Sequence, residues 1–579
     1  MLWEISDFKG IESAHLDIRP GKATILTGVN SSGKSSTLQS LLLAAQSLYN
    51  EGPVVLNGPL VRLGDAQDLV RESSSTGHIG IRLSVDTHLT DGALHDEPLS
   101  AEYELVATED RSSLRAKRIG FTSPSFPGQD LELARANSRG SDVELAMQAT
   151  RHFGPREVLH VKALLGSDKR QLRTYAVMQG LRPIGLVQLM APERVASIYR
   201  AEFESILSES GRDEQLEMKR SGITPQVARE FVRLLAEAAH EDKKLVDISK
   251  RFSHARSGNP YLFDSVWSDL TTSERSDAIG AVAAQRARRA YSLLPIKGPV
   301  LAYGSPVVGL LESALGNALG TSFDALGALN SSLDELSRRV QYLGPLRDEP
   351  RVVWNHWNEL ARGLPVGTRG EFSAAVLSRS ANDAVQYCPP GQARTVDRLS
   401  TAVNRWLEYL QIGDRINARS RGKLGVGFEL HLDGHIRDLT SVGVGVSQTL
   451  PLLVGLLSAP HDSVFIVEQP ELHLHPAVQA RLADFMLSAR PDVSLIIETH
   501  SDAFITRIRR RAAEGSIDTS DVDITFIESK SGGARTRTLK LSEFGDLDEW
   551  PDGFLSSSED DIRAILKMNI ERARGATGD

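Results

Sequence analysis

Hydrophobic positions along the chain follow different spacings in different segments, and each spacing predicts a kind of secondary structure. Near the start, the apolar segment 23–27 is followed by apolar residues every three or four positions over 36–49, which predicts a strand and then a helix. Residues 78–85 and 100–106 instead alternate between apolar and polar side chains, as strands of an antiparallel meander do. We therefore expect an α/β segment followed by an antiparallel β lobe over about 78–150.

The strand pattern fades between about 185 and 340. Segments 227–238 and 281–293 have helical spacing, and frequent Gly and Pro residues interrupt the region. No heptad pattern persists, so we expect a helical insertion and no long coiled-coil arm. Short apolar runs rich in β-branched residues return at 464–467 and 493–497, which is typical of central strands in a covered parallel sheet. The sequence thus predicts an α/β fold whose core is split by the insertion.

The turn between the first apolar strand and its helix has a phosphate-binding sequence. Residues 28–35 read Gly-Val-Asn-Ser-Ser-Gly-Lys-Ser, which fits the pattern G-x-x-x-x-G-K-S. Backbone N–H groups and the helix dipole would face an anion, Lys34 would reach the β- and γ-phosphates, and the Ser35 hydroxyl would bind Mg²⁺. The alternative is an ordinary Gly/Ser surface turn. The strand before the loop and the helix after it favour the phosphate loop over that alternative. The predicted nucleotide contacts are Gly28, Asn30, Ser31, Gly33, Lys34, Ser35 and Ser36.

Two later strands end in candidate catalytic residues. The strand 464–467 is followed by Glu468, Gln469 and Glu471, and Glu468 stands where a carboxylate would hold Mg²⁺, directly or through water. The next buried strand ends shortly before His500, which could approach a γ-phosphate held at the same sheet edge. A capped loop that begins a helix is the alternative for the glutamates, and a buried structural histidine is the alternative for His500. The phosphate loop favours the functional interpretation of both.

Composition narrows the class of protein. The 579 residues are 41% hydrophobic and 24% charged, as in globular proteins. The single cysteine, Cys388, excludes internal disulfides and a four-cysteine zinc site, and we expect a cytoplasmic protein. No apolar run reaches membrane-spanning length, so no membrane partner is expected. Net charge is −9, but arginine clusters within 286–289 and 507–511 leave DNA or RNA open as a ligand, with solvated helix faces as the favoured interpretation.

Taken together, the motifs resemble those of the ABC-like ATPases that include SMC, RecF, OLD and Septu-type proteins. The similarity covers about 1–160 and 340–545. The segments that carry it are 28–35 for the Walker A loop, 441–448 for the signature motif, 468–471 for the Walker B region, 499–501 for the switch-histidine motif, and 343–347 for a stretch common in the group.

The resemblance implies a split ABC-type ATPase head, an α/β fold with a mixed sheet, an antiparallel β lobe and an inserted α-helical lobe. Its expected parts are an N-terminal half over 1–165, a helical insertion over 185–340, a C-terminal half over 341–545 and a small tail domain over 546–579. In the tail, Trp550-Pro-Asp-Gly-Phe554 resembles the W-P-x-G-F element of a domain of unknown function found on some such ATPases.

The resemblance also implies ATP and Mg²⁺ as cofactors and a head-to-tail homodimer that encloses two ATP molecules. Ser35 and Glu468 would hold the metal ion. The signature residues Ser441, Gly443 and Gly445 of one copy would face the nucleotide on the other copy.

One position departs from the family's pattern. A carboxylate usually follows the magnesium-side residue and polarises the attacking water, whereas this chain has Gln469. Glutamine orients water but is a poor base, which predicts slow hydrolysis, and Glu471 could substitute for the missing base.

The function that the resemblance implies is that of a sensor or regulatory ATPase in a bacterial anti-phage defence or DNA-maintenance system, controlling a separate effector such as a nuclease. A RecF-like DNA-repair clamp and a non-hydrolysing nucleotide-switched scaffold are the alternatives. The segment after His500 is too short for the Toprim nuclease domain of OLD proteins, so the nuclease would be another chain.

Overall fold

A computed structural model describes most of the chain in two compact units. Unit 1 comprises 1–127, 180–182 and 331–579, and unit 2 comprises 128–179 and 183–330. Of the predicted arginine cluster at 286–289, Arg288 and Arg289 lie outside the described residues. The described residues are 1–49, 54–86, 98–122, 131–134, 157–161, 172–190, 192–208, 211–212, 219–220, 223–240, 242–287, 292–295, 333, 336–354, 366–530, 532–551, 554 and 564–569.

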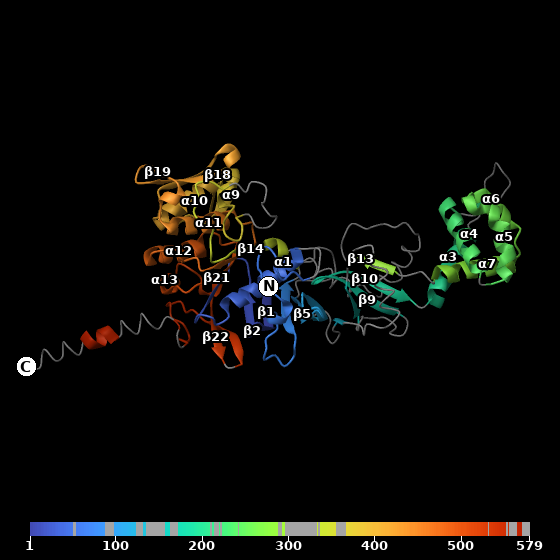
Figure 1. Ribbon diagram of the computed structural model, residues 1–579, viewed down its shortest axis with the longest axis horizontal. Coiled ribbons are helices and arrows are strands. Elements are labelled where there is room, and N and C mark those ends of the chain that lie inside the picture. Colours follow the sequence, from blue (N-terminus) through green and yellow to red (C-terminus); the bar gives the residue numbers. More distant parts are fainter. Residues whose placement is uncertain are drawn as a thin grey trace, which may run out of the picture. The chain divides into compact units, whose positions relative to one another are not determined.

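Unit 1 is built on a mixed β-sheet (Figure 1). Its strands are, in spatial order, β6 (Leu114–Thr122), β5 (Pro98–Ala107), β4 (Ile79–Asp86), β1 (Leu2–Phe8), β2 (Ile11–Asp17), β23 (Gly533–Leu539), β22 (Val522–Lys530), β3 (Ala23–Gly28), β21 (Ser494–Glu498), β20 (Val464–Glu468) and β14 (Val340–Leu343). The strands from β22 to β14 are parallel to one another. The strands from β6 to β2 are antiparallel to their neighbours.

This topology confirms the predicted α/β fold with a split core. Strand β3, from the start of the chain, is hydrogen-bonded on one side to β21 and on the other to β22, both of which follow residue 490. The antiparallel run β4–β5–β6 is the predicted β lobe. Because β3, β21 and β20 are parallel neighbours, their carboxyl ends lie at one edge of the sheet. All residues of β20 and β21 are buried, as in the centre of a covered parallel sheet.

Helices cover the parallel part of the sheet, and smaller sheets lie beside them. The helices around this sheet in the described part of unit 1 include α1 (Lys34–Tyr49), α9 (Ser373–Ser380), α10 (Leu399–Leu410), α11 (Val444–Ser458), α12 (Pro476–Ser488) and α13 (Asp502–Ala513). The smaller sheets contain β15 (Ala384–Tyr387) with β16 (Thr395–Arg398), and β17 (Arg415–Ser420) with β18 (Val426–Leu432) and β19 (His435–Arg437). Short 3₁₀ turns occur at Ala66–Leu69, Gly422–Leu424, Leu439–Ser441 and Thr519–Asp521.

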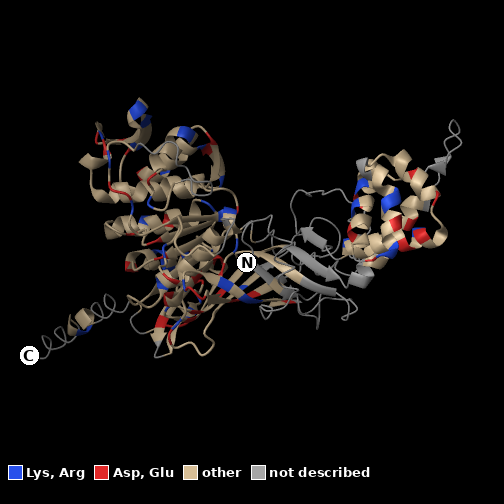
Figure 2. Cartoon of the chain, turned by 45° about the vertical axis from the view of Figure 1, so that its right-hand side comes forward, with Lys and Arg blue, Asp and Glu red and all other residues tan. Residues whose placement is uncertain are grey.

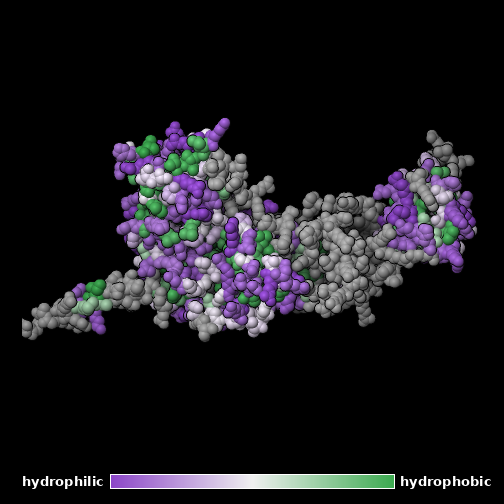
Figure 3. All heavy atoms as spheres, viewed as in Figure 1, coloured by the Kyte–Doolittle hydropathy of each residue, from purple (hydrophilic) through white to green (hydrophobic). Residues whose placement is uncertain are grey.

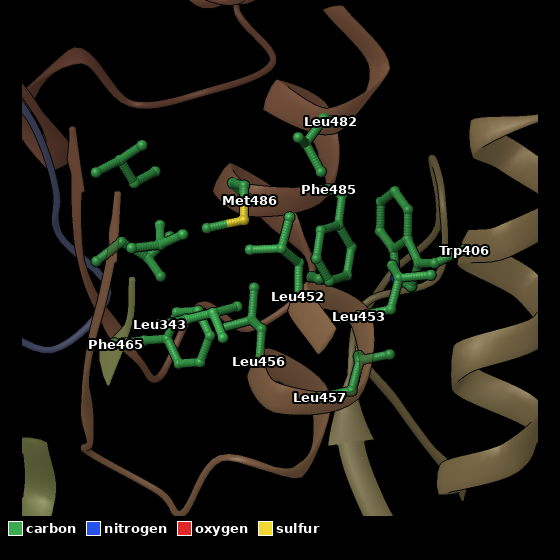
Figure 4. Close-up of a cluster of buried hydrophobic side chains, with 14 of the residues drawn as sticks. Leu343, Trp406, Leu452, Leu453, Leu456, Leu457, Phe465, Leu482, Phe485 and Met486 are labelled. Carbon is green, nitrogen blue, oxygen red and sulfur yellow. The ribbon is translucent and has the colours of Figure 1, made fainter. Parts of the chain in front are cut away.

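Helix α11 lies at the centre of the main core of unit 1. Its residues 450–457 are apolar on all sides, as expected for a helix that other elements surround. Figure 4 shows its leucines between Phe465 of β20, Phe485 of α12 and Trp406 of α10. The rings of Trp406 and Phe485 pack edge to face with centroids 5.2 Å apart. This packing holds the body of α11 firmly, so its N-terminal end is presented from a rigid support.

Unit 2 has a separate aromatic core. Phe231 of α4 packs edge to face on Phe203 of α3 and on Phe263 of α6, in both cases with centroids 5.4 Å apart. The helices are α3 (Pro192–Ser208), α4 (Pro225–Ala239), α5 (Lys244–Arg251), a 3₁₀ turn (Phe252–Ser257), α6 (Pro260–Ser268) and α7 (Thr272–Ala287). The strands are β7 (Leu131–Ala134), β8 (Glu157–Val161), β9 (Leu172–Gln179), β10 (Arg182–Met190), β11 (Gly211–Arg212), β12 (Lys219–Arg220) and β13 (Ser292–Pro295).

The helix predicted over 281–293 is wrong at its C-terminal end. Helix α7 ends at Ala287, and Ser292–Pro295 forms strand β13, paired antiparallel with β10. Two adjacent leucines satisfy a helical and an extended pattern equally well, so pairing with a distant strand decides the outcome.

The arginines of α13 are largely neutralised within the fold. Arg507 and Arg511 both form ion pairs with Asp484 of α12, and Arg510 pairs with Glu514. Arg509 donates to the carbonyl of Gly545. Among the described residues, Lys and Arg are interspersed with Asp and Glu in both units (Figure 2). The cluster therefore joins α12 and α13 and offers little free charge to a nucleic acid.

The visible surface of the described residues mixes hydrophilic side chains with small apolar patches (Figure 3). Within the part of the chain that the structure describes, no helix has both the length and the apolar character required to span a membrane.

Candidate active site

The loop between β3 and α1 has the conformation of a phosphate cradle. Gly28 and Gly33 have φ angles of 144° and 107°, a region that favours glycine. A Cβ on Gly28 would lie 2.5 Å from the carbonyl oxygen of Ile527 in β22, so a side chain does not fit there. Helix α1 begins at Lys34 and has no acidic residue in its first turn. The positive end of its dipole is therefore available to an anion.

Lys34 is buried under this loop. Its Nζ donates hydrogen bonds to the carbonyl oxygens of Gly28, at 3.0 Å, and Val29, at 2.7 Å. An ammonium group has three donors, so one remains for an anion in the cradle. Burial lowers the pKa of Lys34, and the nearby Glu498 carboxylate opposes that shift.

A cavity of about 560 Å³ opens in front of the loop, a size typical of small-ligand sites. It brings eight of the predicted residues together: Asn30, Ser31, Gly33, Lys34, Ser35, Ser36, Gln469 and His500. The remaining lining residues are Gly10, Ser32, Glu498, Ser529 and Ala534. Gly28 is not among the lining residues, but its carbonyl accepts a hydrogen bond from Lys34.

Glu498 is the lining residue that the sequence interpretation missed. It ends β21 and is buried, and the Ser35 Oγ lies 3.0 Å from each of its carboxylate oxygens. Burial and the neighbouring Glu468 raise the pKa of Glu498 to about 7. A signal was present in the sequence, because Glu498 ends a buried apolar strand just as Glu468 does.

Glu468 lies one strand farther from the phosphate loop. It pairs in register with Glu498 across β20 and β21, and it is absent from the described lining of the cavity. The hydroxyl of Tyr342 donates to its Oε1 at 2.7 Å, and Arg347 Nη2 donates to its backbone carbonyl at 3.1 Å. Burial raises the pKa of Glu468. Arg347 lies in the segment 343–347, whose chemical role the sequence left unassigned, and Tyr342 immediately precedes that segment.

Glu471 supports the loop that carries His500. Its Oε1 accepts a hydrogen bond of 2.7 Å from the backbone N–H of His500. The side chain is buried, which raises the pKa of the carboxyl group, and it is not part of the described cavity wall. In this arrangement the Glu471 carboxylate fixes the backbone of His500 and does not face the cavity.

Gln469 and His500 also line the cavity. Gln469 has a φ of 44°, and its backbone N–H donates to the carbonyl of Glu498 at 2.7 Å. Partial desolvation and the charge of Lys34 lower the pKa of His500. Its ring is therefore neutral at pH 7, with one nitrogen able to donate and the other able to accept a hydrogen bond.

The predicted signature residues lie outside this cavity. Ser441 ends a 3₁₀ turn, where its hydroxyl donates to Asp438, and Gly443 is the exposed N-cap residue of α11. A Cβ on Gly443 would meet nothing within 4 Å, whereas one on Gly445 would lie 3.0 Å from the carbonyl of His473. Within the described chain, no signature residue lines the cavity at the phosphate loop. The structure therefore does not complete an ABC-type site within one copy.

The side chains present suit magnesium bound together with a phosphate ligand. Mg²⁺ prefers oxygen ligands and is usually held by one or two carboxylates, waters and substrate phosphates. Ser35 and Glu498 supply such oxygens at the cradle, and Glu468 lies one strand farther away. Among the residues described, no group of three or more His, Cys, Asp or Glu could hold a metal ion unaided.

Comparison with known families agrees with this geometry. Residues 311–506 match the family model described as "AAA domain, putative AbiEii toxin, Type IV TA system", and the match includes the signature, Glu468 and His500. Over this segment the chain is therefore similar to an AAA-family ATPase domain. This confirms the family resemblance that the motifs predicted.

A second family model matches residues 517–565, with the description "Protein of unknown function (DUF3696)". The match contains the Trp550–Phe554 element on which the predicted resemblance rested, but it begins at 517 and not at the predicted boundary of 546. Phe554 is buried and packs edge to face on Phe526 of β22 and against Trp550, with centroids 5.8 and 5.6 Å away. The element therefore attaches the tail to the main sheet.

Solved SMC head structures align over most of the chain but only loosely. The Smc head from Pyrococcus furiosus, bound to the C-terminal domain of ScpA, is 11% identical, covers 93% of this chain and 96% of its own, and has a TM-score of 0.34. The Smc head from Pyrococcus yayanosii is 12% identical and covers 93% and 97%, with a TM-score of 0.33. No curated protein matches the chain.

Proposed function

We propose that this chain binds ATP and Mg²⁺ at the β3–α1 cradle and hydrolyses ATP slowly between two head-to-tail copies. One observation carries the proposal. The cavity contains the phosphate loop, Gln469 and His500, whereas the signature residues lie elsewhere on the surface at the exposed N-terminus of α11. A second copy would bring its signature segment to this cavity. A helix N-terminus with exposed N–H groups is suited to the γ-phosphate of the opposing site.

The residues of the chain would divide the work as follows. Lys34 and the loop amides would bind the β- and γ-phosphates, while Ser35 and a carboxylate would bind the magnesium side. The metal ion supplies charge stabilisation for the leaving phosphates when bound. Gln469 would orient the attacking water, and the neutral His500 would hydrogen-bond the γ-phosphate. Phosphoryl transfer depends mainly on such positioning, so a glutamine at this place slows hydrolysis without preventing it.

The biological role we propose is that of a nucleotide-controlled regulator of a separate effector. Closing of the dimer on ATP would expose or hide a surface for the effector. The matching family model is described with the words "putative AbiEii toxin, Type IV TA system". This favours a defence role with a separately encoded partner, such as a nuclease. Co-purification with the products of neighbouring genes, with ATP and with ADP, tests this part. A partner retained equally in both nucleotide states would contradict regulation by ATP.

A nucleotide-switched scaffold that does not hydrolyse ATP is the second candidate. It is favoured by the engagement of Glu471 with the His500 backbone, which leaves the water position to Gln469. A phosphate-release assay separates the two functions. Slow turnover that requires Mg²⁺ supports the ATPase, and ATP binding without any turnover supports the scaffold.

Gln469→Glu is expected to raise ATP turnover. The change places a general base on the cavity wall where Gln469 now lies. A general base typically contributes about 10²–10⁴-fold, but loose phosphoryl-transfer transition states need less help, so we expect a rise of roughly tenfold. Phosphate release measures turnover, and a nucleotide titration should show little change in affinity. Unchanged or lower turnover in a folded variant would mean that Gln469 is not a weakened catalytic position.

A further inference from the structure

Two glutamates end adjacent strands at the site, and their side chains have different partners. Glu498 lines the cavity, and both of its carboxylate oxygens lie 3.0 Å from the hydroxyl of Ser35. Glu468 lies farther from the phosphate loop, and its Oε1 is bonded to the hydroxyl of Tyr342. The carboxylate in contact with the phosphate loop is thus the one that ends β21, not the one in the motif that resembles Walker B.

The contact matters because of what a metal-bound hydroxyl requires. A serine hydroxyl has one proton and two lone pairs. When a lone pair binds a metal ion, the proton must point to another acceptor, and a carboxylate is the strongest acceptor that a protein offers. Groups that orient metal ligands in this way commonly decide metal affinity. Glu498 already accepts a hydrogen bond from the Ser35 hydroxyl. The lone pairs of that hydroxyl oxygen therefore point away from Glu498 and can bind a metal ion.

The backbone holds Glu498 firmly in this position. Its strand lies between β3 and β20 and is hydrogen-bonded to both. Its carbonyl accepts from the N–H of Gln469, and the next residue, Thr499, donates to the carbonyl of Leu26 at 3.0 Å. A carboxylate fixed on both sides of its strand is preorganised for a ligand at Ser35.

We propose that Glu498 is the positioning residue of the magnesium site and orients the Ser35 hydroxyl toward the ion. Glu468, which is hydrogen-bonded to Tyr342, lies one strand farther from the ion and does not contact Ser35. This inference rests on the proposed function, because it requires ATP to bind with Mg²⁺ at the cradle. It differs from that function in naming which carboxylate serves the metal ion.

The test compares Glu498→Gln with Glu468→Gln, two identical substitutions on neighbouring strands. The affinity for a fluorescent, non-hydrolysable ATP analogue is measured in EDTA and in Mg²⁺, and the ratio of the two gives the enhancement by the metal ion. Glu498→Gln is expected to reduce this enhancement by about 10- to 100-fold, the usual effect of removing a partner of a metal ligand. Its affinity in EDTA should be unchanged or tighter, because a negative charge near the phosphates is lost.

Glu468→Gln is expected to change the enhancement much less. If Glu468→Gln removes the enhancement while Glu498→Gln keeps it, the proposal is wrong and the Walker B assignment is right. Failure of the wild-type protein to bind the analogue in either buffer would contradict the proposed function itself. Glu408→Gln, an exposed site on α10, serves as the control for loss of one negative charge.

A double-mutant cycle with Ser35→Ala tests the contact directly. If Glu498 acts through Ser35, the effect of Glu498→Gln on the enhancement should largely disappear once the hydroxyl is absent. If Glu498 had a purely structural role, Glu498→Gln would lower the melting temperature, and the effects of Glu498→Gln and Ser35→Ala on the enhancement would add. Additive effects in folded proteins would overturn the proposal.

Discussion

Lys34→Ala is expected to abolish ATP binding at working concentrations. The ammonium group is buried beneath the cradle and has one donor free for the phosphates. Removing one member of a buried charge pair typically costs about 2–5 kcal/mol of binding free energy. That corresponds to a loss of at least about 30-fold in affinity. A nucleotide titration by calorimetry measures the change.

Lys117→Ala, on the exposed face of β6, provides the matched control for this variant. It removes the same chemical group from a position far along the sheet from β3 and should leave nucleotide affinity unaltered. The melting temperatures of both variants show whether they are folded. Wild-type nucleotide affinity in a folded Lys34→Ala protein would show that residues 28–35 are not the phosphate-binding loop.

Gly443→Arg is expected to prevent ATP-dependent dimerisation while each copy still binds nucleotide. An added side chain meets nothing within 4 Å in the single copy, and the φ of −60° suits any residue. A positive charge at the helix N-terminus costs only about 0.3–1 kcal/mol, so the fold should tolerate it. In the dimer, the same side chain would occupy the space required by the opposing nucleotide. Light scattering with and without ATP measures the association.

Gly443→Ala is the control for the backbone change, and it should still allow the dimer to form because a methyl group fills little space. Closure of Gly443→Arg with ATP, to the same mass as the wild type, would show that the two copies do not meet through the signature segment.

Local patterns were sufficient for the parts of the site that are continuous in sequence. The phosphate loop, the helix that follows it and the buried strands before Glu468 and His500 were all predicted, because each depends on spacing over a few residues. The split core also followed, since the phosphate loop and the later strands were separated by a helical segment. The family model that matches 311–506 then agreed with an AAA-type ATPase domain.

Relations between distant strands could not be predicted in the same way. Which glutamate lies beside Ser35 depends on whether β20 or β21 is the neighbour of β3, and the pairing of β21 with β3 joins residues more than 450 positions apart. The hydrogen bond from Tyr342 to Glu468 is likewise non-local. The same reason explains β13, where pairing with β10 ended the predicted helix.

The central claim, that one ATP site is built from two copies, is tested most directly by mixing Lys34→Ala with Gly443→Arg. In a head-to-tail dimer, the phosphate loop of the Gly443→Arg copy meets the unaltered signature segment of the Lys34→Ala copy, which restores one complete site. Each variant alone should show no ATP turnover in a phosphate-release assay, and the mixture should regain it. A mixture that stays inactive although the two variants associate, or full turnover by Gly443→Arg alone, would contradict the shared site.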